Sequence, residues 1–300
     1  MPDQLQLRGG TTSEHSSFTG ALREVTVDTT KKTLVVHDGS QAGGTPLMRE
    51  SGGGVNASIN SVNIGKGANS VAGNTVLGET ALDAAVTGAN NTAIGKDALT
   101  SLTSATAVVA VGQGALDACT TGSYNVGIGQ HALGACTTGA NNVAIGRVAL
   151  ENNTTGGQNV AIGYISMDSN TSSSGNVAVG AYTLQAQTDG SGSNVAVGDS
   201  VLYSNTSGNN NVGVGHRSLN ANTTANNNVG VGHDALVLNT TGQSNTALGS
   251  DALKANTTSN NNTALGYAAM QANTTGTQNV AVGTNALDAN TTANNNTAVG

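Results

Sequence analysis

A chain of 300 residues is long enough for one or two ordinary domains, but 42 glycines, one phenylalanine and no tryptophan leave few bulky side chains to fill a wide core. Only 9% of the residues are charged and the formal net charge is −7, which excludes the clustered basic residues of a protein that binds nucleic acid or an anionic membrane surface. No apolar run approaches the roughly 20 residues of a transmembrane helix. The start, Met1 to Leu5, lacks the features of a signal peptide, so we expect cytoplasmic synthesis, reduced cysteines and no membrane insertion.

Residues 1–50 differ in character from the rest and are predicted to form a small N-terminal β-hairpin module. Apolar and polar residues alternate at 24–28 and 33–39, on either side of a turn-like segment at 29–32. We expect this module to serve for attachment or to cap the repeats that follow. Residues 51–73 are predicted to form a Gly-rich linker and a transitional coil that ends at Gly65.

Residues 74–300 contain a repeat of 17 residues. The residue before each repeat glycine is always Val, Ile or Leu, and the fourth residue after it is Leu or Met in every complete repeat. Such a fixed period is typical of stacked repeats, whereas a disordered linker has no reason to keep register. All intervals are 17 residues except one of 18, and the repeat glycines are Gly78, Gly95, Gly112, Gly129, Gly146, Gly163, Gly180, Gly198, Gly215, Gly232, Gly249, Gly266, Gly283 and Gly300.

Seventeen residues are too few for a helical hairpin of useful length, but they suffice for one coil of a narrow solenoid. Each coil would contain a strand of about five residues and a second short segment, either a strand or one helical turn. Asparagine lies four residues before the glycine in thirteen of fourteen repeats, and a second asparagine column runs from Asn153 to Asn290. Both columns predict side-chain ladders at coil corners. The predicted fold class is all-β, a repetitive parallel β-solenoid or β-roll.

The middle position of each predicted strand is Ala or Gly, with Val76 as the exception. If the flanking Val, Ile and Leu side chains fill the core, these small residues lie on the opposite face, where they suit close approach by another chain. We therefore expect lateral packing between identical chains. Three-fold symmetry, giving a homotrimeric fibre, is an analogy with other fibres. The alternative is a lone solenoid with an Ala-rich surface.

Few residues suggest chemistry. His216 and His233 are one repeat apart in equivalent positions, so they can stack or contribute to a metal ring in a trimer, but we interpret them as chance occupants of a variable position. Cys119 and Cys136 are also one repeat apart, within disulfide range, although two free cysteines fit cytoplasmic synthesis better. The pair at 37–38, His-Asp, lacks the context of a catalytic triad. We expect no catalytic, cofactor-binding or metal-binding residues, and no cofactor.

Several N-terminal segments resemble the module that phage tail fibres share with the major tropism determinant family of phage receptor-binding proteins. The segments are residues 7–12 (LRGGTT), 14–15 (EH), 18–20 (FTG), 24–28 (EVTVD) and 35–39 (VVHDG). Residues 60–68, NSVNIGKGA, and the later N-x-A-[VI]-G units resemble the β-roll heads of trimeric autotransporter adhesins, whose coils are shorter. The Asn-Thr-Thr-Gly type of 17-residue repeat is also similar to tail-fibre repeats.

Together these resemblances imply a structural tail fibre of a bacteriophage, made in the host cytoplasm and carried on the virion, which links the virion to the host surface. The N-terminal module would bind other tail or baseplate proteins. A distal part of the fibre, either in this chain or in another one, would bind the host receptor. Residues 296–300 stop partway through a repeat, so we expect further protein or another chain to cover this end.

Two alternatives remain open at this point. A bacterial trimeric surface adhesin would need a signal peptide and a membrane anchor. An ice-binding solenoid would use Thr-Thr columns such as 137–138, although these lapse at 171–172. We do not expect an enzyme, because solenoids that degrade polysaccharides place carboxylate pairs between aromatic side chains, and both are sparse in this sequence.

Overall fold

The computed structural model describes residues 8–17, 25–29, 33–36, 45–46, 57–59, 62–188 and 192–300. Within these ranges the chain forms a four-stranded sheet, a sixteen-stranded sheet and one helix of six residues. The elements of the N-terminal part are β1 (Arg8–Gly10), α1 (Thr12–Ser17), β2 (Val25–Asp28), β3 (Thr33–Val36) and β4 (Thr45–Pro46).

The small sheet has the order β1-β2-β3-β4. Strands β2 and β3 pair antiparallel, with Val25 opposite Val36, as the alternating sequence predicts; the turn residues 30–32 lie outside the described residues. Strand β1 pairs parallel with β2, and β4 pairs antiparallel with β3. Helix α1 begins with a capping box, in which the backbone N–H of Thr11 donates to Glu14 Oε2 at 2.6 Å and that of Glu14 donates to Thr11 Oγ1 at 3.3 Å.

The large sheet begins with three antiparallel strands and continues as a parallel ladder. Strands β5, β6 and β7 pair antiparallel, so the predicted transitional segment that ends at Gly65 joins the sheet as an antiparallel strand. Gly65 and Gly78 are only 13 residues apart, too few to complete a coil of 17, and the chain reverses instead. The strands are β5 (Ala57–Ile59), β6 (Val62–Gly65), β7 (Thr75–Gly78), β8 (Thr92–Ile94), β9 (Val109–Val111), β10 (Val126–Ile128), β11 (Val143–Ile145), β12 (Val160–Ile162), β13 (Val177–Val179), β14 (Val195–Val197), β15 (Val212–Val214), β16 (Val229–Val231), β17 (Thr246–Leu248), β18 (Thr263–Leu265), β19 (Val280–Val282) and β20 (Thr297–Val299).

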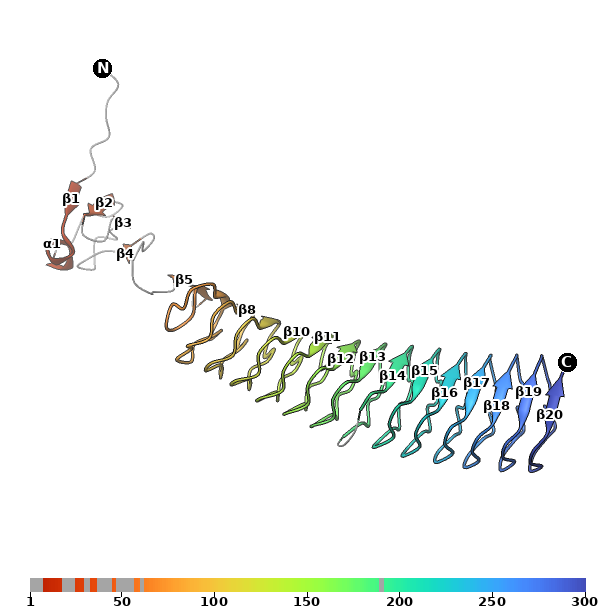
Figure 1. Cartoon of the computed structure of the whole chain (residues 1–300). Coiled ribbons are helices and arrows are strands. Elements are labelled where there is room, and N and C mark those ends of the chain that lie inside the picture. The colour runs from red at the N-terminus through yellow and green to blue at the C-terminus, as the bar shows by residue number, and fades with distance from the viewer. Residues whose placement is uncertain are drawn as a thin grey trace, which may run out of the picture.

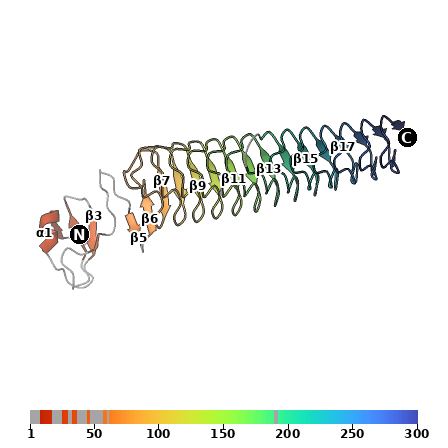
Figure 2. The same cartoon turned by 90° about the horizontal axis from the view of Figure 1, so that it is seen from below.

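From β7 to β20 the chain is a β-solenoid in which each coil adds one strand to the parallel sheet (Figure 1). Equivalent residues of successive repeats are paired, for example Val143 with Val160. The strands line one side along the whole length, and the turns form the other side (Figure 2). The single 18-residue interval does not disturb this register, because Val177 still pairs with Val195. The predicted fold class, a repetitive parallel β-solenoid, is confirmed.

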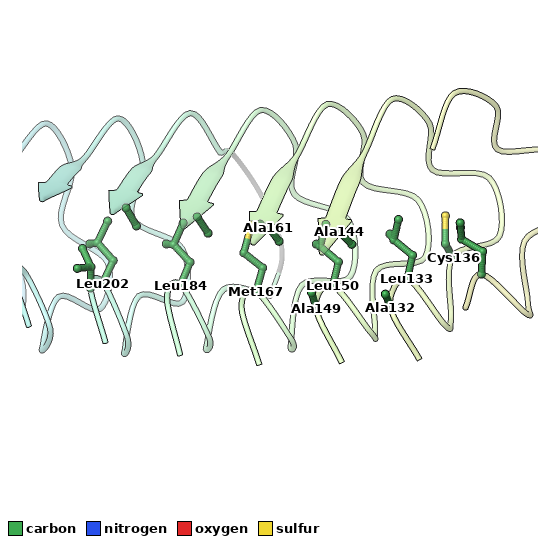
Figure 3. Close-up of a cluster of buried hydrophobic side chains, with 14 of the residues drawn as sticks. Ala132, Leu133, Cys136, Ala144, Ala149, Leu150, Ala161, Met167, Leu184 and Leu202 are labelled. Carbon is green, nitrogen blue, oxygen red and sulfur yellow. The ribbon is translucent and has the colours of Figure 1, made fainter. Parts of the chain in front are cut away.

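The core is a row of leucines packed against a row of alanines and glycines. Leu150 and the equivalent leucines from Leu82 to Leu253 are fully buried, as predicted. Ala144 and Ala161, at the middle strand position, are also fully buried, whereas Val143 and Ile145 on the other strand face are partly exposed. Figure 3 shows these alanines on the strands beside the leucine row. Our prediction that the Ala and Gly face points outward was therefore wrong.

The width of the coil explains why the small residues lie inside. The leucine in the turn segment of each coil extends across the interior and leaves little space for a side chain on the strand opposite. A Cβ placed on Gly127 would lie 3.0 Å from Leu116 Cδ1, and one on Gly213 would lie 2.5 Å from Val201 Cγ1. The larger Val and Ile side chains fit only on the outer face, because interiors are close-packed and tolerate little extra volume.

The second segment of each coil is neither a strand nor a helical turn. It is a turn in which two residues, Val148 and Leu150 in one coil, have left-handed φ values of 53° and 52°. The backbone N–H of Leu150 donates to the carbonyl oxygen of Ser166 in the next coil at 3.0 Å. Burial of the leucine and this bond between coils offset a conformation that is unfavourable for a non-glycine residue.

Both predicted asparagine ladders are present and buried. In the first column, Asn142 Nδ2 donates to the carbonyl oxygen of Gly156 at 2.9 Å. In the second column, Asn222 Nδ2 donates to Asn205 Oδ1 at 2.8 Å, one coil away. The left-handed residue at the first corner is the one before the column, such as Asn141 with φ of 60°, and not the ladder asparagine. The asparagines therefore serve as buried hydrogen-bonding residues that join coils.

Candidate functional site

The outer face of the parallel sheet is an apolar surface without cover in the single chain. It consists of the first and third residues of strands β7–β20, which we name the outer sheet face. Every one of these residues is Val, Ile, Leu or Thr, so the outer sheet face carries no charge. Within the sheet, the exposed fraction is 38% at Ile128 and 47% at Leu248. Parallel sheets are usually covered on both faces, and a continuous exposed apolar surface is typical of an association site.

A second exposed feature lies beside this face and varies from coil to coil. It comprises the residue directly after each repeat glycine, which we name the variable column. The members are Glu79, Lys96, Gln113, Gln130, Arg147, Tyr164, Ala181, Asp199, His216, His233, Ser250, Tyr267 and Thr284. The hydrophobic and asparagine columns restrict their positions to a few residue types, whereas the variable column contains acidic, basic, amide, aromatic and imidazole side chains.

Neighbouring members of the variable column contact each other across one coil. Lys96 Nζ lies 3.5 Å from Glu79 Oε2. Arg147 Nη1 donates to the hydroxyl of Tyr164 at 3.2 Å, and its guanidinium carbon lies 5.5 Å from the ring centroid. These pairs are solvent-exposed, so each contributes little to stability. The column therefore presents a line of polar and aromatic groups suited to contact with a polar ligand or surface.

The most chemically varied part of the column is centred on two histidines. His216 and His233 stack as the equivalent positions predict, with ring centroids 5.2 Å apart and planes at 21°. Asp234 follows His233 directly, and Asp234 Oδ2 lies 3.8 Å from Nδ1 of His233. Ligand atoms of these three residues all lie within 4.8 Å of one another. Our sequence reasoning noted the two histidines but missed the aspartate.

Asp234 is held among several charged groups. Its side chain is only 7% exposed, and Oδ1 lies 3.7 Å from Arg217 Nε while Oδ2 lies 3.4 Å from Lys254 Nζ. Lys254 makes a shorter contact of 2.8 Å with Asp251 Oδ1, and this hydrogen bond raises the pKa of the lysine. On the other side, His216 Nε2 lies 3.7 Å from Asp199 Oδ2.

Cys119 and Cys136 are both free and fully buried. They occupy the second asparagine column in two coils that lack asparagine, and each thiol lies 3.4 Å from the carbonyl oxygen three residues further along. A hydrogen bond between the two thiols lowers the pKa of Cys119, while the same bond and burial raise the pKa of Cys136. The two cysteines are thus free, as we expected, and the structure adds that both lie within the core.

The His-Asp pair at 37–38 lies outside the described residues. Among those that the structure describes, no helix is both long and apolar enough to cross a bilayer.

Comparison with known proteins links the N-terminal part of the chain to a family. Residues 5–41 match the Major tropism determinant N-terminal domain. The chain is also 63% identical over 49 residues to the "Tail fiber receptor-binding protein" of Bordetella phage BPP-1, a match that covers 16% of this chain and 13% of that protein. No solved structure shows significant similarity to the chain. The predicted resemblance to phage tail fibres with a major-tropism-determinant-like N-terminus is therefore confirmed for this segment.

Proposed function

We propose that this chain is a structural tail-fibre protein of a bacteriophage, in which the solenoid is a shaft between the virion and the host surface. The observation that carries the proposal is the match of residues 5–41 to the Major tropism determinant N-terminal domain, combined with a repetitive solenoid from β7 to β20. A rod built from identical coils suits a spacer, because each coil adds about 4.8 Å of length without a new fold. The proposal includes no catalytic step.

The shaft is proposed to be a homotrimer that associates through the outer sheet face. This surface repeats its Val, Ile and Thr side chains at the spacing of the coils, so a partner must present apolar groups at the same spacing over the same length. Another copy of this chain meets that requirement. The support thus comes from the Val and Ile columns, and not from the buried Ala column that first suggested lateral packing. Three-fold symmetry follows the resemblance to trimeric fibres.

The N-terminal module is proposed to attach the shaft to other tail or baseplate proteins, as a component of the virion made in the host cytoplasm. The support is that the family match lies at this end, at residues 5–41. The relative from phage BPP-1 is named a receptor-binding protein, and we propose that host recognition occurs at a distal part of the fibre.

The ice-binding alternative is weakened by the geometry of the first threonine column. The hydroxyl of Thr137 donates to the carbonyl oxygen of Thr154 at 3.1 Å, and the same bond recurs along the column. A hydroxyl that already bonds the backbone is a poor template for ordered water. The surface-adhesin alternative predicts a location on the bacterial envelope, which the following experiment distinguishes.

The location is tested by immunogold electron microscopy of purified virions, with antibodies raised against residues 74–300. Labelled tail fibres would support the proposal, while unlabelled virions and a labelled bacterial envelope would contradict it. The assembly is tested by light scattering after size exclusion, where a mass of three times 29.4 kDa is expected. Val160→Lys with Ile162→Lys should give the monomer mass, whereas Gln130→Lys in the variable column should leave the trimer intact.

A further inference from the structure

We propose that His216, His233 and Asp234 form a binding site for a divalent transition-metal ion on the flank of the shaft. Two imidazoles and one carboxylate are the ligand types that Zn²⁺, Ni²⁺ and Cu²⁺ prefer. Sites with three protein ligands keep a further position open for water or another ligand. The potential ligand atoms lie within 4.8 Å of one another, so modest side-chain rotations suffice to bring them around one ion.

The solenoid register positions the two histidines. Their repeat glycines, Gly215 and Gly232, are one coil apart, and strands β15 and β16 are paired in register. The imidazoles therefore stack at 5.2 Å without any dedicated loop. Their side chains are about half exposed, 48% and 57%, so both rings can rotate and remain reachable from solvent.

Asp234 gives the strongest indication of a missing ligand. Its side chain is more than nine-tenths buried, yet Oδ1 makes no hydrogen bond and is inaccessible to solvent. A buried carboxylate oxygen without a hydrogen-bond partner is costly, and the contact with Arg217 Nε at 3.7 Å is too long to provide one. The other oxygen, Oδ2, faces the histidines, 3.8 Å from His233 Nδ1, and is the atom through which this carboxylate would bind a cation.

The surrounding charge permits a cation. Three carboxylates (Asp199, Asp234 and Asp251) face two cationic side chains (Arg217 and Lys254), which leaves a formal charge of −1 before the histidines are counted. Lys254 lies closer to Asp251, at 2.8 Å, than to Asp234, at 3.4 Å, so it can remain with Asp251 when a metal binds. A bound ion would join adjacent coils and stabilise the folded chain by mass action.

The test is isothermal titration of the full chain, without a polyhistidine tag, with ZnCl₂ at pH 7.5. We expect one Zn²⁺ per chain and a higher thermal midpoint. His216→Gln and His233→Gln should each weaken binding by at least roughly tenfold, because loss of even a residue that only supports a ligand costs about that much. His131→Gln is the matched control, because His131 lies on the same shaft without a second histidine beside it, and its affinity should stay unchanged. Both target histidines are exposed, so neither substitution endangers folding.

A second readout identifies the ligands directly. Cu²⁺ bound to the wild-type chain should show splitting from two nitrogen ligands in its electron paramagnetic resonance spectrum, and either histidine substitution should reduce this to one. Binding that persists unchanged in the double variant His216→Gln, His233→Gln would overturn the proposal. One ion per three chains would also overturn it, because that stoichiometry indicates a ring shared between chains and not a site within each chain.

Discussion

The side-chain oxygen of Asn142 accepts a hydrogen bond of 3.0 Å from the backbone N–H of Asn159, the equivalent residue of the next coil. The same carboxamide donates through Nδ2 to the carbonyl oxygen of Gly156 at 2.9 Å. One side chain therefore satisfies two buried backbone groups that the strand ladder leaves without partners, and the arrangement is repeated along the shaft.

Replacing this residue should be costly. Asn142→Leu, of similar size, would leave two buried backbone groups without partners, at about 1–3 kcal/mol each. We expect the free energy of unfolding to fall by about 2–6 kcal/mol in urea titration, on that basis. Thr155→Ala, at the exposed second Thr position, serves as the control and should change little. Equal stability of the two variants would show that the ladder contributes nothing.

A substitution at Gly146 tests whether the close approach between coils requires glycine. Its φ is 134°, and a Cβ at this position would lie 2.4 Å from the carbonyl oxygen of Gly163. Gly146→Ala should therefore destabilise the shaft by more than about 1 kcal/mol. Gly134→Ala is the matched control, since the equivalent positions carry Asp117 and Glu151. We expect it to be neutral or stabilising by up to about 1 kcal/mol in the same thermal melt.

The assignment of the two strand faces is tested by one pair of substitutions at adjacent residues. Ala161→Leu adds volume to a filled interior and should lower the free energy of unfolding by about 1–3 kcal/mol or more. Val160→Leu adds volume on the outer sheet face, which the chain itself does not cover, and should lower the free energy of unfolding less than Ala161→Leu does. The opposite ranking in chemical unfolding would mean that the valine column lies inside.

Asp168 predicts a pH dependence. Burial raises its pKa above the ordinary 3.8, and the nearby carboxylate of Glu151 raises it further. The folded chain thus binds this proton more tightly than the unfolded chain, so the ionised group lowers stability at neutral pH. This loss of stability disappears as the pH falls through the raised pKa and towards 3.8. Asp168→Asn should raise the thermal midpoint at pH 7 and have no effect at about pH 3, while Asp288→Asn, at an exposed position, should have no effect at either pH. A gain for Asp168→Asn that persists unchanged at acidic pH would contradict this account.

Sequence periodicity predicted the features that depend on register alone. The coil length, the buried leucine column, the two asparagine ladders and the stacking of His216 on His233 all follow from the 17-residue spacing. The spacing did not predict which strand face lies in the core. Val, Ile and Ala are all apolar, so an alternating pattern cannot tell which side is inside. The distance between the strands and the turns opposite decides which face lies inside, since Leu116 already occupies the space opposite Gly127.

The backbone conformation at Asp234 explains why the sequence did not reveal this residue as part of the site. Two adjacent residues of an extended chain point in opposite directions, so a residue next to His233 would not be expected to share its site. Asp234 has a left-handed φ of 55°, which departs from extended backbone and keeps its carboxylate on the side of the histidine. A recurring positive φ two residues after the glycine has no signature in the sequence, where this position carries residues as different as Val148 and Asp251.

Because the coils pair in register, the number of coils can change without a change of fold. Duplication or deletion of one 17-residue unit would join strands that already fit each other, so the rod can lengthen or shorten in whole steps of about 4.8 Å. Neither the interior nor the outer sheet face would need compensating substitutions. Reach can thus be altered by recombination within the repeat, independently of the module at the N-terminal end.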